Sequence, residues 1–303
     1  MSDKLRIAKQ FIAALPYSGA LGMELQELDG GVAVIDMPYD ERLIGDPRTG
    51  VLHGGSVSAL MDTCCGAAVM SHPSNPGGTA TIDLRIEYLR AAVPGQRITA
   101  RAECRLCARH GTGRRRRQPG RHRHRQFHGG GQTMSTRSKP EAVQVVKKRR
   151  DAALRALVDG VPYISFLGIE FDRRGDELTG VLPFSDKLIG NPLLQALHGG
   201  VTASFLEVTS IITLSWEYLW EDLESGALAV DKMDATHLPR LPKTIDFTVD
   251  YLRSGLPRDA YARARINRSG RRYASVHVEA WQDNRSKLFA QATGHFLMPQ
   301  RRD

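Results

Sequence analysis

The chain carries the same block of sequence twice. Residues 43–55 read LIGDPRTGVLHGG and residues 188–200 read LIGNPLLQALHGG, and the shorter stretches 15–22 and 161–168 also match each other. A third match joins residues 81–90, TIDLRIEYLR, to residues 244–253, TIDFTVDYLR. Two copies are too few for a solenoid, and 303 residues suffice for two domains, so the repeat predicts two like domains side by side.

Both copies predict the same order of elements. An amphipathic helix is followed by two strands, a loop, a helix that starts at His-Gly-Gly, and further strands that alternate apolar and polar residues. The two helices that start at His-Gly-Gly are apolar on nearly every side, which indicates burial all round. The helices that start at His-Gly-Gly are expected at 56–70 and 201–216. Strands are expected at 23–28, 32–38 and 81–89 in the first copy, and at 244–252, 261–267, 272–282 and 288–298 in the second. The pattern predicts an α+β fold, a mostly antiparallel sheet around one central helix in each copy. An insertion at 216–242 predicts an extra helix or lid.

The net charge of +9 comes from one tract. Residues 105–125 contain nine arginines and no acidic residue, and the rest of the chain is neutral. The wider segment 105–133 stands where the second copy has its last two strands, and it has a similar length but no strand pattern. We therefore hypothesise that about 23 residues are read out of frame, which resequencing of the gene would test.

The arginine-rich tract also has functional interpretations. It does not favour nucleic-acid binding, because Phe127 is its one aromatic residue and stacking partners are lacking. Cys104 and Cys107 with His124 and His128 resemble a zinc-finger spacing, but the gap is long and the apolar core of a finger is missing. A solvated basic loop is the preferred interpretation, and no metal is expected.

The remaining composition favours a cytoplasmic protein. The four cysteines do not form the framework of a disulfide-rich secreted domain. The first residues contain no apolar stretch typical of a signal peptide, and no apolar run is long enough to span a membrane.

One acid recurs inside each apolar helix, nine residues after the histidine. Asp62 and Glu207 occupy this position, where burial is expected to raise the pKa of an unpaired carboxyl group. Such a group suits a general base or a nucleophile. The alternative is an acid on an exposed stripe, but its recurrence in both copies favours chemistry.

The paired glycines at each helix start offer free backbone N–H groups to a carbonyl oxygen, which outlines an oxyanion hole. These residues are Gly54 and Gly55, and Gly199 and Gly200. His53 and His198 are interpreted first as residues that fix the helix start. Thr81 and Thr244 either position a water molecule or are ordinary strand residues.

At these residues the chain resembles the hot-dog fold thioesterases of the PaaI and 4-hydroxybenzoyl-CoA thioesterase group. The resemblance implies two tandem hot-dog domains, at 1–136 and 137–303, whose sheets join into a pseudo-dimer. It implies that the protein hydrolyses an acyl-CoA thioester without a cofactor. Neither a membrane nor a nucleic acid is an expected partner, and double hot-dog units can form homo-oligomers. The alternative function is a non-catalytic acyl-CoA-binding or regulatory hot-dog protein.

The resemblance further implies that each site draws on both copies. One site would combine His53, Gly54 and Gly55 with Glu207 and Thr244, and the other His198, Gly199 and Gly200 with Asp62 and Thr81. Relatives often carry Asn or Gln six residues before the histidine, where this chain has Pro47 and Pro192. Asn191 is the expected substitute in the second copy, whereas Asp46 in the first would bring a negative charge. The sequence therefore predicts a weaker site at His53 than at His198.

Overall fold

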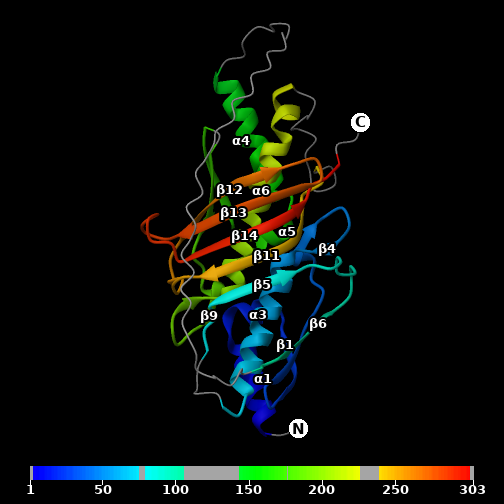
Figure 1. Cartoon of the computed structure of the whole chain (residues 1–303), viewed down its shortest axis with the longest axis vertical. Helices are drawn as coiled ribbons and strands as arrows, with labels where there is room; N and C mark the ends of the chain where they lie inside the picture. Colours follow the sequence, from blue (N-terminus) through cyan, green and yellow to red (C-terminus); the bar gives the residue numbers. More distant parts are fainter. Residues whose placement is uncertain (1–2, 75–78, 106–142, 176, 226–238, 301–303) are drawn as a thin grey trace, which may run out of the picture.

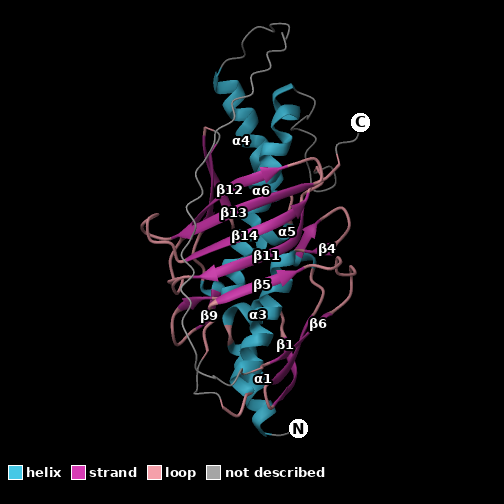
Figure 2. Cartoon of the chain, viewed as in Figure 1, coloured by secondary structure: helices cyan, strands magenta, loops and turns pink. Residues whose placement is uncertain are grey.

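The structure is a computed structural model that describes residues 3–74, 79–105, 143–175, 177–225 and 239–300. Its long axis follows the two central helices, and the largest sheet crosses that axis (Figures 1 and 2). The first copy comprises α1 (Asp3–Ala14), α2 (Pro16–Ala20), β1 (Glu24–Asp29), β2 (Val32–Met37), β3 (Ile44–Asp46), β4 (Val51–Leu52), α3 (Gly54–Ser71), β5 (Asp83–Glu87) and β6 (Ile98–Glu103).

The second copy repeats this order and continues it. It comprises α4 (Val143–Asp159), α5 (Pro162–Leu167), β7 (Glu170–Arg174), β8 (Glu177–Leu182), β9 (Ile189–Asn191), β10 (Ala196–Leu197), α6 (Gly199–Ser225), β11 (Lys243–Tyr251), β12 (Ala260–Ser269), β13 (Tyr273–Trp281) and β14 (Ala290–Leu297). The predicted helices and strands are present with ends shifted by at most two residues, except that α6 continues nine residues beyond the predicted end at 216. The short helices α2 and α5, which begin at the repeated Pro16 and Pro162, were not predicted.

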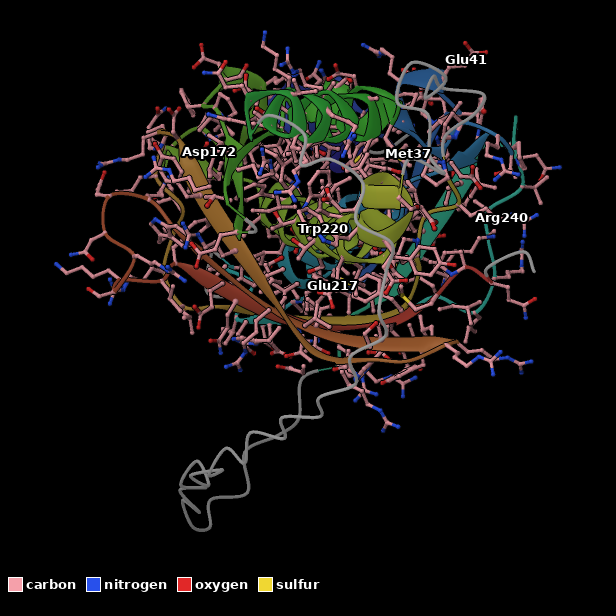
Figure 3. The ribbon with its side chains drawn as sticks, turned by 90° about the horizontal axis from the view of Figure 1, so that it is seen from above. Met37, Glu41, Asp172, Glu217, Trp220 and Arg240 are labelled. Atoms are coloured by element: carbon pink, nitrogen blue, oxygen red, sulfur yellow. The ribbon has the colours of Figure 1, made fainter. Side chains whose placement is uncertain are left out.

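The second copy is a complete hot-dog domain. Its strands follow the order β11-β14-β13-β12-β8-β7 and are antiparallel throughout. They curve around α6, whose end carries Trp220 in the view down the long axis (Figure 3). Phe205, Leu206 and Ile212 of α6 are fully buried. Burial on all sides explains why this helix has no polar face. The predicted α+β architecture is confirmed.

The first copy lacks two strands among the described residues. Its β1-β2-β6 sheet and its β5 strand correspond to β7-β8-β12 and β11, but no described strand joins β5 to β6. In the second copy, β14 and β13 fill that place. The predicted replacement segment lies outside the described residues from position 106 onward, as does the domain boundary at 136, and both stay predictions.

A local two-fold axis relates the copies and joins their sheets. Strand β5 pairs antiparallel with β11, so that Arg85 faces Thr248. These two residues are equivalent in the repeat, and equivalent residues can face each other only where the axis passes between them. The predicted joining of the sheets is confirmed at this strand pair.

The helices α3 and α6 pack against each other across the same axis. A side chain at Gly55 would collide with Ser204, and one at Gly200 would collide with Ala59, the residue equivalent to Ser204. Close helix contact therefore requires the second glycine of each pair. Helix α6 has 27 residues against 18 in α3, so the insertion begins as extra helical turns. Residues 226–238 lie outside the described part.

One side of α3 has no described strand over it, and we call this side the open face (Val57, Met61, Cys65 and Val69). These residues recur every four positions and so lie on one side of the helix. Their equivalents in α6 are Thr202, Leu206, Ser210 and Leu214, each no more than 3% exposed. On the open face, Cys65 is exposed and the other three are half-buried. Within the described residues, no helix is both long and apolar enough to cross a membrane.

Candidate functional site

Two pockets lie where the copies meet, and each contains one of the repeated acids. The Glu207 pocket has a volume of about 920 Å³ and includes His53, Gly54 and Thr244. The Asp62 pocket has a volume of about 710 Å³ and includes His198, Gly199 and Thr81. The structure thus brings together the acid, the histidine, the first glycine and the threonine of each candidate site, and these residues come from both copies.

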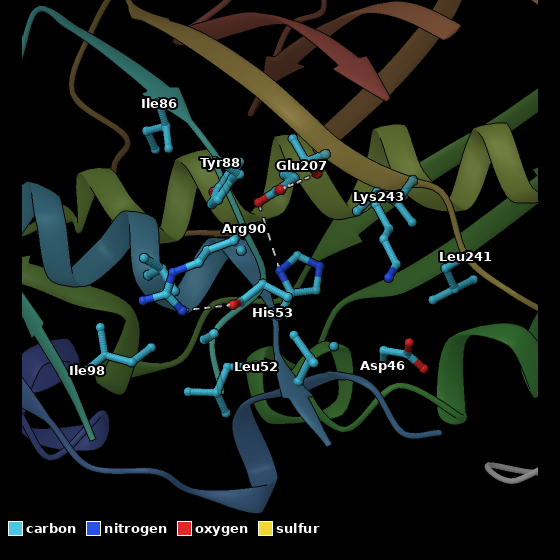
Figure 4. A pocket seen from close by; sticks show the side chains of 18 of the residues that line it. Asp46, Leu52, His53, Ile86, Tyr88, Arg90, Ile98, Glu207, Leu241 and Lys243 are labelled. Carbon is cyan, nitrogen blue, oxygen red and sulfur yellow. Dashed lines mark hydrogen bonds and ion pairs between the residues drawn. The ribbon is translucent and has the colours of Figure 1, made fainter. Parts of the chain in front are cut away.

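Glu207 is held at the floor of its pocket by residues from both copies. Its carboxyl group is 1% exposed, and Oε1 accepts a 2.5 Å hydrogen bond from the Thr244 hydroxyl. The other oxygen, Oε2, lies 3.9 Å from Nδ1 of His53 (Figure 4). Thr244 therefore fixes the carboxyl group, and its hydroxyl is already engaged with the acid.

His53 caps the start of α3. Its Nδ1 accepts a 2.9 Å hydrogen bond from the Gly55 N–H, and burial lowers the pKa of its imidazole to about 4. A ring nitrogen that accepts a hydrogen bond is unprotonated, so the imidazole is neutral and its contact with Glu207 is not an ion pair. The ring stacks on Tyr163 of the second copy, with centroids 4.9 Å apart. His53 positions the helix start, as the sequence suggested.

Gly54 supplies the free donor of this site. It is the first residue of α3, and its N–H has no hydrogen-bond partner within the described residues. A Cβ atom here would lie 2.8 Å from Oε1 of Glu207 and 2.9 Å from the Tyr88 hydroxyl oxygen, so only glycine fits. The Gly55 N–H is already bonded to His53, which leaves Gly54 as the donor for an incoming carbonyl oxygen.

Burial raises the pKa of Glu207 to about 7, partly opposed by the hydrogen bond from Thr244. The charged form loses most of its hydration inside the protein, which favours the protonated acid. A carboxyl group with this pKa exchanges its proton near neutral pH, the range that acid–base catalysis requires.

The Asp62 site has the same parts but a different bonding pattern. Oδ1 of Asp62 accepts a 2.9 Å hydrogen bond from Thr81, and Oδ2 accepts one of 3.1 Å from the Gly200 N–H. That N–H is shared with Nδ1 of His198 at 2.9 Å. The acid of this site is therefore bonded to the backbone of the helix start, whereas Glu207 is not.

His198 differs from His53 in its second ring nitrogen. Its Nε2 lies 3.0 Å from the Thr63 hydroxyl, whereas Val208 occupies the position equivalent to Thr63. Burial lowers the pKa of His198, and the nearby Asp62 carboxylate partly opposes this. Both histidines are therefore neutral helix caps.

The residues expected to replace the family's Asn or Gln have local roles. Oδ1 of Asn191 accepts hydrogen bonds from the N–H groups of Leu193 and Leu194, and Asn191 lines the Asp62 pocket. Asp46 lines the Glu207 pocket, and its Oδ1 accepts a hydrogen bond from the Arg48 N–H. Both side-chain oxygens stabilise the turns that follow them.

Two tyrosines of the sites were not singled out from the sequence. The Tyr88 hydroxyl lies 2.7 Å from the Ser58 hydroxyl, which donates to the Gly54 carbonyl oxygen, and burial raises the pKa of Tyr88. Tyr251, the equivalent residue, donates directly to the Gly199 carbonyl oxygen at 2.8 Å. Their signal was present in the repeated Tyr-Leu-Arg at the end of each matching strand.

Of the residues with zinc-finger-like spacing, for which no metal was expected, Cys107, His124 and His128 lie outside the described residues. Within the described ranges, no group of three His, Cys, Asp or Glu side chains could hold a metal ion.

Comparisons with known families and sequences agree on one superfamily. A model described as "Thioesterase superfamily" matches residues 49–106, and one described as "Acyl-CoA thioesterase N-terminal domain" matches residues 225–297. The medium/long-chain acyl-CoA thioesterase YigI of Escherichia coli K12 is 28% identical over 107 residues, which cover 31% of this chain and 68% of YigI. Its counterpart from Salmonella typhimurium is 27% identical over the same coverage.

Solved structures match about half of this chain. A protein from Chromobacterium violaceum is 33% identical, covering 53% of this chain and all of its own, with a TM-score of 0.36. A Shewanella oneidensis protein related to the thioesterase superfamily is 24% identical, covering 51% and 98%, with a TM-score of 0.43. A Bacillus halodurans protein solved with CoA is 21% identical, covering 55% and 98%, with a TM-score of 0.35.

Proposed function

The chain belongs to the thioesterase superfamily, and we propose that it hydrolyses acyl-CoA thioesters at the Glu207 site. The observation that carries the proposal is the placement of a buried carboxyl group with a pKa of about 7 beside the unpaired N–H of Gly54. A thioester carbonyl bound to that N–H would present its carbon atom to the acid. The names of the curated relatives support acyl-CoA as the substrate.

The proposed reaction uses the carboxylate form of Glu207. Glu207 takes a proton from a water molecule, whose oxygen attacks the thioester carbon, or it attacks that carbon directly and water then releases the acyl group. In both routes the Gly54 N–H stabilises the negative oxygen, the C–S bond breaks, and the CoA sulfur leaves with a proton. The products are a free carboxylic acid and CoA thiol. Thr244 and His53 orient the groups that react.

The rim of the pocket suits the phosphates of CoA. Arg90 and Lys243 both line it, and in the close view they lie on either side of His53 (Figure 4). Arg90 comes from the first copy and Lys243 from the second. Cationic side chains bind phosphate groups through charge-assisted hydrogen bonds, which supports a CoA ester over an uncharged thioester.

We rank the Glu207 site above the Asp62 site, the reverse of the order expected from the sequence. Both carboxylate oxygens of Asp62 already accept hydrogen bonds, from the Thr81 hydroxyl and the Gly200 N–H, and this leaves the acid less available to react, although the Gly199 N–H, the equivalent of Gly54, has no hydrogen-bond partner within the described residues. Within the same residues, Glu207 accepts no hydrogen bond from the helix start. The negative charge of Asp46, which led to the opposite expectation, is partly compensated by its bond to the Arg48 N–H.

Release of free thiol from acyl-CoA esters of graded chain length tests the proposal. Wild-type protein and Asp62→Asn are expected to release CoA, and Glu207→Gln is expected to release little. A folded wild-type protein that binds acyl-CoA but releases no thiol would instead be a binding or regulatory hot-dog protein. Equal turnover by wild type and Glu207→Gln would refute the assignment of Glu207.

A further inference from the structure

The two pockets differ on the side where the described part of the first copy has two strands fewer than the second copy. The Glu207 pocket is lined by Met61, Ile86 and Ile98, which come from α3, β5 and β6. Their equivalents in the second copy are Leu206, Val249 and Ala260, and none of these lines the Asp62 pocket. The assignment of Ile98 to Ala260 follows from strand pairing, because they face the equivalent residues Met37 and Leu182.

Burial separates two of these three positions. Leu206 and Ala260 are each 0% exposed, whereas their equivalents Met61 and Ile98 are half-buried; Ile86, like Val249, is buried. In the second copy, β13 and β14 lie between β12 and β11 and close the domain over α6. In the first copy, the Glu207 pocket continues along α3 between β5 and β6. The two copies thus serve as an internal comparison: a pocket reaches between these two strand positions only in the copy whose described sheet is incomplete.

The extension is apolar and continuous with the candidate catalytic carboxyl group. Val57 and Met61 lie one helical turn apart on the open face and both line the pocket. Ile86 and Ile98 face them from the two strand edges, and Figure 4 shows both on the side of Glu207 opposite Leu241. A surface of this kind binds hydrocarbon, because each methylene group that leaves water stabilises the complex.

We propose that the acyl chain of the substrate lies in this extension, between β5 and β6 and against the open face, and that the Glu207 site therefore takes long acyl chains. The inference rests on the proposed function for the identity of the substrate. The carbonyl group lies at Gly54, the CoA part lies toward Arg90 and Lys243, and the chain passes Met61 and Ile98. The Asp62 pocket does not reach between β5 and β6; its apolar lining runs the other way, past Met70 of α3 toward Ile7 and Phe11 of α1.

Binding of non-hydrolysable thioethers tests the inference separately from catalysis. Calorimetry with S-hexadecyl-CoA and S-ethyl-CoA would compare the wild type with Met61→Trp, whose indole ring would fill the extension. We expect wild type to bind the hexadecyl compound at least about ten-fold more tightly than the ethyl compound. Met61→Trp is expected to remove most of that difference and to leave the affinity for S-ethyl-CoA unchanged.

Val69→Trp is the matched control. Val69 lies on the same open face, two turns further along α3, and does not line the pocket. Its substitution should leave both affinities unchanged. Ile98→Trp narrows the extension from the β6 side and replaces Met61→Trp if that variant does not fold.

The outcomes separate the two proposals. Chain-length-dependent binding that Met61→Trp removes, without thiol release by wild type, would sustain the inference and refute the proposed hydrolysis. Equal affinity for the two thioethers, or equal losses with Met61→Trp and Val69→Trp, would overturn the inference even if thiol is released.

Discussion

The hydroxyl oxygens of Tyr17 and Tyr163 lie 2.8 Å apart and share a hydrogen bond, although the two tyrosines occupy the same position in the two copies. Both side chains are fully buried. The local two-fold axis therefore passes between the tyrosine rings as well as between β5 and β11. Tyr163 stacks on His53 and Tyr17 packs against the ring of His198, so each tyrosine supports the helix cap of the other copy.

Tyr17→Phe and Tyr163→Phe should destabilise the protein by different amounts. The Tyr163 hydroxyl also lies 3.0 Å from the Ser204 hydroxyl, whereas Ala59 occupies the equivalent position in the first copy. Tyr17→Phe leaves Tyr163 with Ser204 and should cost about 0.5–1.5 kcal/mol in urea unfolding. Tyr163→Phe removes the centre of the network and should cost about 1–3 kcal/mol. Equal costs would contradict this asymmetry, and the double variant measures the coupling.

Turnover should rise with pH through the pKa of Glu207. The reacting form is the carboxylate, and burial raises the pKa to about 7, so kcat/KM should increase about ten-fold per pH unit below that value and level off above it. Initial rates with one acyl-CoA across this range give the profile. Asp62→Asn should keep the same profile. If Asp62→Asn removed the rise, the titrating group would be Asp62.

The protonation of Glu207 should also affect protein stability: the free energy of unfolding should fall as pH rises, whereas turnover increases. Between the ordinary value of 4.5 and the raised value of about 7, folded protein holds the Glu207 proton that the unfolded chain releases. The Glu207 contribution to the free energy of unfolding therefore falls as pH rises through this window, by on the order of 3 kcal/mol. Glu207→Gln cannot ionise, so its free energy of unfolding lacks this decrease. The variant should therefore become more stable relative to wild type as pH rises.

Urea unfolding above and below this window measures the gain. Glu217→Gln, at an exposed position on the same helix, is the control and should show no such pH-dependent difference. A constant offset between Glu207→Gln and wild type would show that Glu207 does not titrate in this range.

Two glycines of α3 should respond oppositely to alanine. Gly54→Ala keeps the backbone N–H but places a methyl group against Glu207 and Tyr88, which should displace the carbonyl group from its donor and lower turnover by about 100-fold or more. Gly66→Ala meets no atom within 4 Å, so it should keep activity and raise stability by about 0.5–1 kcal/mol. Rate assays and thermal unfolding on both variants test this pair. An active Gly54→Ala would exclude the proposed carbonyl position.

The open face should be chemically accessible at Cys65. Cys65 is exposed and Cys64 is buried; burial raises the thiol pKa of both, that of Cys64 to about 11. In a variant that keeps Cys65 as its one cysteine, iodoacetamide should label the folded protein. The matched control carries Ser210→Cys as its one cysteine, at the equivalent and fully buried position, and should be labelled only after unfolding. Equal labelling of the two would show that α3 is covered.

The repeat made most of the fold predictable. The recurrence of Asp62 and Glu207 after His-Gly-Gly located both sites, because a polar residue kept in an apolar helix needs a reason other than packing. The sequence did not reveal that the Gly200 N–H bonds to Asp62 whereas the equivalent Gly55 N–H bonds to His53 and not to Glu207, since this depends on the exact approach of two helices. Tyr88 and Tyr251 were missed because strand alternation alone explained them. Helices α2 and α5 were missed because they are too short to show a period.

Fusion of the two copies also changes what a single mutation can do. In a dimer of identical chains, every substitution appears twice, and a loss in one site is a loss in both. Here Ser204 corresponds to Ala59 in the repeat, and Glu207 corresponds to Asp62, so the equivalent positions of the two copies already differ. One half can retain the complete sheet and hold the other in place, while the incomplete half is free to acquire a new specificity.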